Sequence, residues 1–266
     1  MPIAVTCEQC GKKYRVRDDL FGKKFRCKKC GEPVQIPVQG RVYRHTERER
    51  GFEFAIGGED LELLTSHLEQ HLGPIETVLH EVISDLVHVD LHILLPQADR
   101  DYTILATTGM SDRPMSVPDE GKSLQYAELL LCLPADWPLE QEQFTEEKYY
   151  WPIRWLKMLA RFPHEYQTWL GSGHTIPNGD PAEPFHESVP FVCWLLLNPP
   201  FGPEALTPCE ISEEKQVHFY ALMPLYEEEM IYKLAHGYDA LLERFDKYQT
   251  SFVLDPTRRN VCKRKG

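Results

Sequence analysis

The chain has 266 residues, of which 26% are charged and 42% hydrophobic, and its net charge is −12. This length allows one large domain or two, each with enough apolar residues for a buried core. The apolar runs are too short to span a bilayer, and the N-terminus lacks the basic and apolar regions of a signal peptide. We therefore expect a cytoplasmic protein with no membrane partner.

The charge is unevenly distributed along the chain. Residues 1–50 hold 13 Lys/Arg against 6 Asp/Glu, whereas the remaining residues hold 16 against 35. A basic head thus precedes an acidic body. An acidic body disfavours nucleic acid as a direct partner and favours cationic partners through long-range steering. High solubility is the alternative explanation for the same charge.

Four of the eight cysteines lie in two CxxCG motifs near the N-terminus. Cys7 and Cys10 precede Gly11, Cys27 and Cys30 precede Gly31, and 16 residues separate the two motifs. Zinc prefers four thiolates in a tetrahedron, and a closed four-cysteine shell is typical of structural zinc. We therefore predict one structural zinc per chain, held by Cys7, Cys10, Cys27 and Cys30. A redox dithiol pair or an iron–sulfur site is the alternative, but neither requires two symmetric motifs.

The head, TCEQCGKKYRVRDDLFGKKFRCKKCGEPVQIP, resembles short zinc-ribbon domains at the N-termini of bacterial multidomain proteins. The small core of such a ribbon would comprise Tyr14, Val16, Leu20, Phe25, Val34 and Ile36. Only Tyr14 and Phe25 are placed to stack on bases, and both are needed for packing, so we do not expect the head to bind nucleic acid. Residues 41–58 alternate in charge and end in glycines, as is typical of a tether. The predicted organisation is a zinc ribbon over residues 1–40, a linker over 41–58 and a larger domain over 59–266.

The larger domain begins with a predicted amphipathic helix from Glu59 to Leu72, which Gly73 and Pro74 end. A strand is expected over residues 75–82. Residues 87–95 alternate apolar and polar side chains, and residues 102–108 are rich in β-branched and aromatic ones, which predicts two antiparallel strands.

Strands and helices then follow one another to the end of the chain. Three further strands are predicted, over residues 126–133, 190–197 and 217–224. One helix is expected from Ile153 to Phe162, between Pro152 and Pro163, and a helical stretch over 226–248 is broken at His236 and Gly237. This order of elements predicts an α+β domain with a mixed or antiparallel sheet and flanking helices.

The run HVDLHILLP followed by ATTGMSDRPM resembles the suppressor of fused domain. The resemblance continues, in the same order, in the blocks at residues 127–138, 151–179 and 217–245. It implies a suppressor of fused-like fold and non-enzymatic binding of another protein. The animal protein sequesters a transcription factor and takes an extended peptide as a strand between two lobes, whereas bacterial members are thought to be immunity proteins. The chain matches only the first lobe, so the contact residues of the peptide clamp cannot be carried over.

Two groups of residues have side chains that could support catalysis. The loop over residues 171–187 contains His174, Asp180, His186 and Glu187, but their spacing matches no hydrolytic signature. His88, Asp90 and His92 alternate along one predicted strand. We expect them on the solvated side of a half-buried strand, and a row of metal ligands is the alternative.

We therefore predict a non-enzymatic protein-binding module, an immunity protein of a bacterial polymorphic toxin system whose partner is a cationic toxin domain. The alternatives are a zinc-ribbon adaptor in transcription-linked regulation and a hydrolase that uses the His174 loop. Asp112, Arg113 and His174 are the candidate partner-binding residues. For Asp112 and Arg113 the other interpretation is a turn cap with a buried ion pair that fixes the loop.

Overall fold

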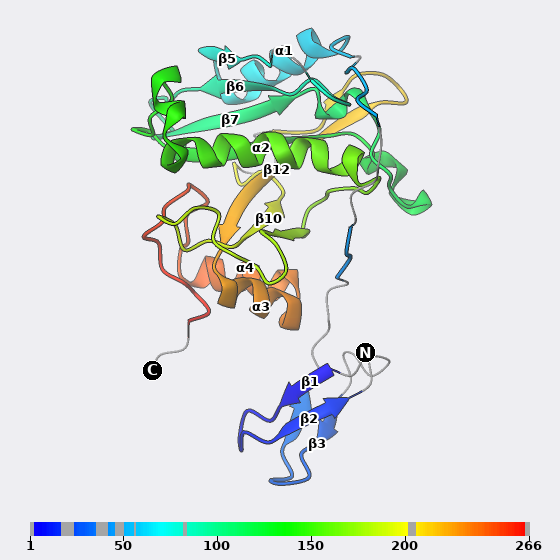
Figure 1. Ribbon diagram of the computed structural model, residues 1–266, viewed down its shortest axis with the longest axis vertical. Coiled ribbons are helices and arrows are strands. Elements are labelled where there is room, and N and C mark those ends of the chain that lie inside the picture. The colour runs from blue at the N-terminus through cyan, green and yellow to red at the C-terminus, as the bar shows by residue number, and fades with distance from the viewer. Residues whose placement is uncertain are drawn as a thin grey trace. The chain divides into compact units, whose positions relative to one another are not determined.

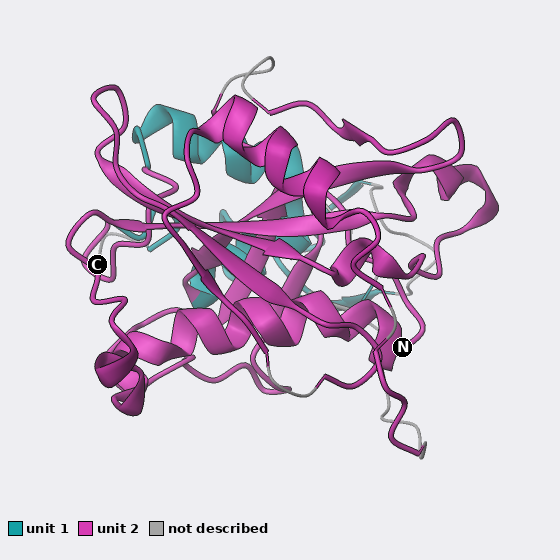
Figure 2. Ribbon diagram, turned by 90° about the horizontal axis from the view of Figure 1, so that it is seen from above, with its two compact units in different colours: residues 1–44, 227–250, 259–266 teal, residues 45–226, 251–258 magenta. Residues whose placement is uncertain are grey.

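The computed structural model describes residues 3–16, 24–35, 42–45, 51–55, 57–81, 84–201 and 206–263. The predicted ribbon residues Leu20 and Ile36 lie outside these ranges. Contacts divide the chain into two compact units, coloured separately in Figure 2. The first comprises residues 1–44, 227–250 and 259–266, and the second comprises residues 45–226 and 251–258.

The N-terminal region consists of two small β-hairpins, each with one CxxCG motif between its strands (Figure 1). Strand β1 (Ile3–Thr6) pairs with β2 (Lys13–Val16), and β3 (Lys24–Arg26) pairs with β4 (Pro33–Gln35). A small core joins the hairpins, in which Tyr14, Val16 and Phe25 pack against buried Val5 and Val34 and against the cysteines. The prediction of a small β region with a four-cysteine cluster is confirmed.

The second unit is built on one mixed sheet with the strand order β5-β6-β7-β8-β12-β10-β9, and β11 pairs with β12 beside this path (Figure 1). Every neighbouring pair is antiparallel except β8 and β12, which are parallel. This arrangement confirms the predicted α+β fold. The strands are β5 (Thr77–Leu79), β6 (Asp90–Leu94), β7 (Tyr102–Thr108), β8 (Ala127–Pro134), β9 (Thr175–Pro177), β10 (Cys193–Leu197), β11 (Cys209–Glu210) and β12 (Gln216–Leu225).

Helices cover both faces of this sheet, as Figure 2 shows from above. Apolar side chains of α2 (Glu147–Glu165) form the main core with one face, to which Tyr220 contributes. Phe219 therefore points to the other face. Its ring stacks there on the ring of His67 of α1 (Leu61–Leu72), with 5.6 Å between the ring centroids. The expectation that Asp90 and His92 are solvated is wrong: they are 5% and 2% exposed, because this second face is covered as well.

Helix α2 is longer at both ends than its prolines suggested. It starts at Glu147, five residues before Pro152, and continues through Pro163 to Glu165. A proline inside a helix costs about 3 kcal/mol because it removes one N–H donor and crowds the preceding turn. Burial of Trp151, Ile153, Leu156 and Leu159 outweighs this cost, so packing overrides the local signal.

The C-terminal helices belong to the first unit and are α3 (Glu227–His236) and α4 (Tyr238–Lys247). They are separated, as predicted, at Gly237, which has a positive φ of 96°. The fully buried carboxylate of Glu229 accepts the backbone N–H of Val261 at 3.0 Å and so fixes Val261 on α3. Among the described helices, none combines the length and the hydropathy that crossing a membrane requires.

Candidate functional site

The four cysteines of the head converge on one point. Their sulfur atoms all lie within 4.8 Å of one another, with Cys7 and Cys30 separated by 3.6 Å and Cys10 and Cys27 by 3.5 Å. A tetrahedral zinc with bonds of about 2.3 Å would place its sulfur ligands about 3.8 Å apart, so the cluster fits such an ion. Among the described residues this is the one group of three or more His, Cys, Asp or Glu side chains that could hold a metal.

Local hydrogen bonds explain why the motifs take this shape. Gly11 and Gly31 have φ values of 70° and 77°, and each donates its N–H to the carbonyl of the first cysteine of its motif at 2.9 Å. Glycine takes such positive φ values without strain. The Tyr14 hydroxyl lies 3.0 Å from the Cys27 sulfur and accepts the Lys28 N–H at 2.8 Å. One hairpin thus supports the motif of the other.

In the second unit, the sequence Gly109–Pro114 forms a loop that we call the motif loop. Gly109 ends β7 with a φ of 98°, and a Cβ atom at this position would lie 1.8 Å from the carbonyl oxygen of His88. No side chain fits there, because both the backbone conformation and the space exclude one. Gly109 therefore places the short 3-10 turn Met110–Asp112 directly beside the segment that enters β6.

A buried carboxylate holds this turn from the next strand. Glu128 of β8 is fully buried and accepts the backbone N–H of Ser111 at 2.9 Å and the Ser111 and Thr107 hydroxyls at 2.6 Å each. Burial raises the pKa of Glu128 to about 7, although these hydrogen bonds favour the charged form. The sequence reasoning missed this residue, and a single carboxylate inside the apolar run AELLLCLP was the available signal.

The next two residues of the motif loop contact the segment made of residues 51–55, 57 and 58, which we call the strap. Asp112 accepts the Gly58 N–H at 3.1 Å, and the Arg113 guanidinium donates to the Glu53 carboxylate at 2.6 Å. The backbone of the strap also pairs with residues 84–86: Leu86 N–H donates to the Glu53 carbonyl at 2.9 Å and Ala55 N–H to the Ser84 carbonyl at 3.2 Å. Asp112 and Arg113 therefore fix the loop and the strap to each other, and their role in partner binding stays a prediction.

A cavity of about 520 Å³ lies beside Arg113. Its lining comes from the strap, from the motif loop and its continuation, and from the end of α2: Glu53, Arg113, Pro114, Ser116, Pro163, His164 and Gln167. The His164 ring lies 2.9 Å from the Met110 carbonyl through Nε2, which must donate because a carbonyl only accepts. Burial lowers the pKa of His164 to about 4, so the ring is neutral near pH 7.

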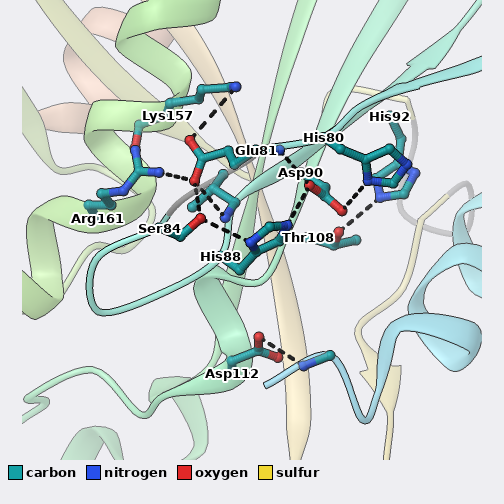
Figure 3. A network of polar contacts seen from close by, with 12 residues as sticks. His80, Glu81, Ser84, His88, Asp90, His92, Thr108, Asp112, Lys157 and Arg161 are labelled. Carbon is teal, nitrogen blue, oxygen red and sulfur yellow. Dashed lines mark hydrogen bonds and ion pairs between the residues drawn. The ribbon is translucent and has the colours of Figure 1, made fainter. Parts of the chain in front are cut away.

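A polar network connects the strands behind the motif loop with α2 (Figure 3). Glu81 pairs with Arg161 and Lys157, and the Asp90 carboxylate lies 2.8 Å from His80 Nδ1 and 3.1 Å from His88 Nε2. The Ser84 hydroxyl lies 2.9 Å from His88 Nδ1, which completes a row of serine, histidine and aspartate.

This row does not provide a nucleophile. Ser84 is 6% exposed, and its hydroxyl also lies 2.8 Å from the Glu81 carboxylate, to which it donates. A serine nucleophile needs an accessible oxygen whose proton passes to the histidine. The contacts instead join Ser84, His88 and Asp90 to one another and, through Glu81, to α2. No metal group forms in this part of the described chain.

The predicted hydrolase loop is spread out rather than gathered around one point. His174 lies at the edge of the sheet, where its carbonyl accepts the Leu196 N–H at 2.9 Å and its ring contacts Trp169 at 4.3 Å. The His186 ring instead lies 2.7 Å from the Ser188 hydroxyl. His174, Asp180, His186 and Glu187 do not form a metal group among the described residues. A role of His174 in partner binding stays a prediction.

Residues 85–259 match the family model described as suppressor of fused protein (SUFU). The chain belongs to the suppressor of fused family. The match includes the motif loop, Glu128 and His164, whereas the four cysteines and the strap precede it. The residues that line the cavity therefore lie in the family domain, except Glu53, which precedes it.

Individual relatives are distant in sequence and similar in fold. The uncharacterized protein UU111 of Ureaplasma parvum serovar 3 is 23% identical over 213 residues, which is 79% of this chain and 99% of that protein. A suppressor of fused homolog from Neisseria gonorrhoeae superposes with a TM-score of 0.55 at 18% identity and covers 77% of this chain and 97% of its own.

Two further solved structures show the same fold. The structure titled as the Sufu–Fu complex matches with a TM-score of 0.54 at 14% identity, over 77% of this chain and 93% of that chain. Drosophila suppressor of fused matches with a TM-score of 0.51 at 13% identity, over 79% of this chain but only 52% of its own. The suppressor of fused fold is thus one that binds another protein in a solved complex.

Proposed function

We propose that this chain is a non-enzymatic protein-binding module that neutralises a toxin domain made in the same cell, as an immunity protein in the cytoplasm. Membership of the suppressor of fused family supports the binding role. The solved Sufu–Fu complex supports it further, because a related fold there holds another protein. The buried polar groups described above are engaged in fixing the fold, which suits a rigid binding surface.

The observation that carries the toxin proposal is the segment over residues 136–147, in which every charged residue is acidic and which we call the acidic segment. Between Lys122 and Lys148 the chain has no Lys or Arg. All the carboxylates of the segment are exposed, namely Asp136, Glu140, Glu142, Glu146 and Glu147. Glu146 pairs with Lys148 and Glu147 with Arg154, so the field rests mainly on Asp136, Glu140 and Glu142. Such a surface attracts a cationic protein over distances comparable to the Debye length and raises its association rate. A cationic enzyme that acts on nucleic acid is the class of toxin that fits this field.

We propose that the four-cysteine cluster holds one structural zinc and that this zinc folds the head rather than contacting the toxin. The sulfur geometry supports a closed four-thiolate shell, which leaves no open position for chemistry. Lys12, Lys13, Lys28 and Lys29 flank the motifs and offset the excess negative charge of four thiolates around a dication. Part of the basic character of the head therefore has a local purpose.

Co-expression tests this function. The full chain is produced together with toxin domains encoded beside its gene, growth is scored, and complexes are recovered by pull-down. Rescue of growth together with a recovered complex supports the immunity role. If no neighbouring domain is retained and the chain instead recovers a transcription factor or nucleic acid, the zinc-ribbon adaptor replaces this proposal.

A charge-reversal pair tests the steering. Glu140→Lys with Glu142→Lys should slow association with a cationic toxin about tenfold at low salt and leave the dissociation rate nearly unchanged. The matched control is Glu213→Lys with Glu214→Lys, which changes charge equally at two exposed positions before β12. These positions precede the start of the β8–β12 pairing, whereas the acidic segment follows the end of β8. Equal slowing by both pairs would show an effect of net charge without a steering surface.

A further inference from the structure

The strap pairs with residues 84–86 as an extended peptide would. Its residue Phe54 faces Asp85 in an antiparallel bridge, flanked by the Ala55 N–H bond to Ser84 and the Leu86 N–H bond to Glu53. The Glu53 N–H additionally donates to the Asp85 carboxylate at 2.9 Å. Main-chain pairing of this kind is independent of side chains, so another extended segment could make it equally well.

The ion pair between strap and body has one fixed member and one exposed member. Arg113 stands on the motif loop, which Gly109 and the two hydrogen bonds from Ser111 to Glu128 hold in place, and its side chain is 29% exposed. Glu53 stands on the strap, and its side chain is 57% exposed. An exposed ion pair contributes little to stability because water and salt screen it. Glu53 is therefore the member that an incoming carboxylate would replace.

The charges around the cavity select the kind of ligand. Among the described residues of its lining, Arg113 and Glu53 are the charged ones, since the His164 ring is neutral and its Nε2–H is engaged with Met110. Once Glu53 leaves, a single guanidinium remains, and its planar fork matches one carboxylate. A volume of about 520 Å³ lies within the range of small-ligand pockets and has room for a short side chain and its neighbours.

We propose that the cavity beside Arg113 binds a carboxylate on an extended segment of the partner protein, and that Glu53 of the strap occupies this site until the partner arrives. The assignment rests on the proposed protein-binding function and names the group that is recognised. The partner segment pairs with residues 84–86 where the strap pairs now, and it places a Glu or Asp side chain on Arg113.

Two features keep the free-energy cost of replacing the strap by a partner segment low and make the replacement compatible with a cationic partner. The rings of Phe52 and Phe54 are 57% and 72% exposed, so the strap buries few apolar atoms that its departure would uncover. The acidic segment and the cavity lie at opposite ends of α2, whose 19 residues span about 28 Å. A partner with a basic surface can thus be steered to one end and anchored by a single carboxylate at the other.

The strap itself supplies the probe for the test. The double variant Glu53→Lys with Ala55→Pro opens the strap in the full chain, because the lysine repels Arg113 and the proline removes the N–H that the Ser84 carbonyl accepts. A fluorescein-labelled peptide with blocked ends and the sequence of residues 51–58, GFEFAIGG, is then titrated by fluorescence polarisation. The control peptide is GFQFAIGG, which differs only in the carboxylate.

The open variant should bind the Glu peptide at least tenfold more tightly than the Gln peptide, and wild type should bind the Glu peptide at least tenfold more weakly than the open variant does. Arg113→Gln in the open background should abolish the preference, whereas Arg154→Gln, which changes an exposed arginine on α2, should preserve it. Equal affinity for both peptides would overturn the proposal. Should the double variant fail to fold, Glu53→Lys alone is measured with the same peptides, and equal affinities there overturn it too.

A third peptide distinguishes the source of the carboxylate. It is GFQFAIGG with a free C-terminus, and binding equal to that of the Glu peptide would overturn the side-chain assignment, because the terminal carboxylate would then occupy the site in a shifted register. Toxin neutralisation is scored separately by co-expression. Wild type that rescues growth while the peptides show no preference would refute this site alone, whereas a clear peptide preference without rescue would refute the toxin and keep the site.

Discussion

The carboxylate of Glu128 lies 2.6 Å from the hydroxyl of Ser111 and accepts the backbone N–H of the same residue at 2.9 Å. One buried side chain thus determines how the motif loop leaves β7. Keeping Glu128 ionised at this buried position costs free energy of folding, because burial raises its pKa to about 7.

Glu128 should make stability fall as pH rises. Its pKa is higher in the folded chain than in the unfolded chain, so its contribution is complete below the unfolded value and is lost as pH rises to about 7. The loss amounts to about 3 kcal/mol, since one pKa unit corresponds to about 1.4 kcal/mol. Urea unfolding of wild type and Glu128→Gln between pH 4.5 and 8 should give a stability difference that shifts in favour of Gln. A constant difference would contradict the raised pKa.

His164 should act in the opposite direction. Burial holds its pKa at about 4, below its usual value, so its contribution is present above the unfolded pKa and is lost as pH falls towards 4. His164→Gln retains a donor for the Met110 carbonyl and removes this titration. Between pH 6.5 and 4 wild type should lose at most about 3 kcal/mol relative to the variant, measured by urea unfolding. If the unfolding free energies of wild type and variant changed with pH in parallel, protonation of the ring would have no cost in the folded chain.

Gly109→Ala should prevent the motif loop from forming. The added Cβ would lie 1.8 Å from the His88 carbonyl, and the backbone would keep a φ of 98°. We expect a loss of at least about 3 kcal/mol, or no folded protein, in thermal unfolding. Gly121→Ala is the control, because its φ is not positive and its nearest neighbour would lie at an ordinary 3.6 Å. Similar losses in both variants would contradict the steric explanation.

The head should contain one zinc per chain, measured by metal analysis of freshly purified protein. Structural zinc contributes on the order of 10 kcal/mol to folding a domain of this size, so Cys27→Ser or a strong chelator should unfold residues 1–40. Residues 59–266 should then melt at an almost unchanged temperature. A common transition for both parts would contradict the division of the chain at residues 41–58.

Side-chain alternation and cysteine spacing predicted the parts of the structure that depend on near neighbours. Residues 102–108 form β7 at the expected positions, and the two CxxCG motifs bring their sulfur atoms together. Helix α2 was predicted too short because Pro152 and Pro163 are local breakers, whereas its stability comes from packing on the sheet. Strands β9 and β11 are too short for a periodic signal.

The candidate site was predicted in part. The motif loop was singled out by its sequence, and an ion pair that fixes it was one interpretation of Asp112 and Arg113. The partner of Arg113 was not predicted, because Glu53 lies 60 residues away, and the pair is half-exposed rather than buried. His164 follows Pro163, where the helix was expected to end, and so carried no signal of burial. Asp90 and His92 were placed on a solvated face because alternation cannot reveal that a second helix covers that face.

The single parallel pairing in the sheet determines the order in which the chain can fold. Strands β5 to β8 form an antiparallel set from neighbouring segments, and β9, β10 and β12 form another, but the sets join only when β12 pairs with β8 across about ninety residues. Long-range closure of this kind is slow. On the ribosome, β8 must therefore wait with one edge unpaired until almost the whole domain has been made. During synthesis this edge is where the chain is most open to aggregation.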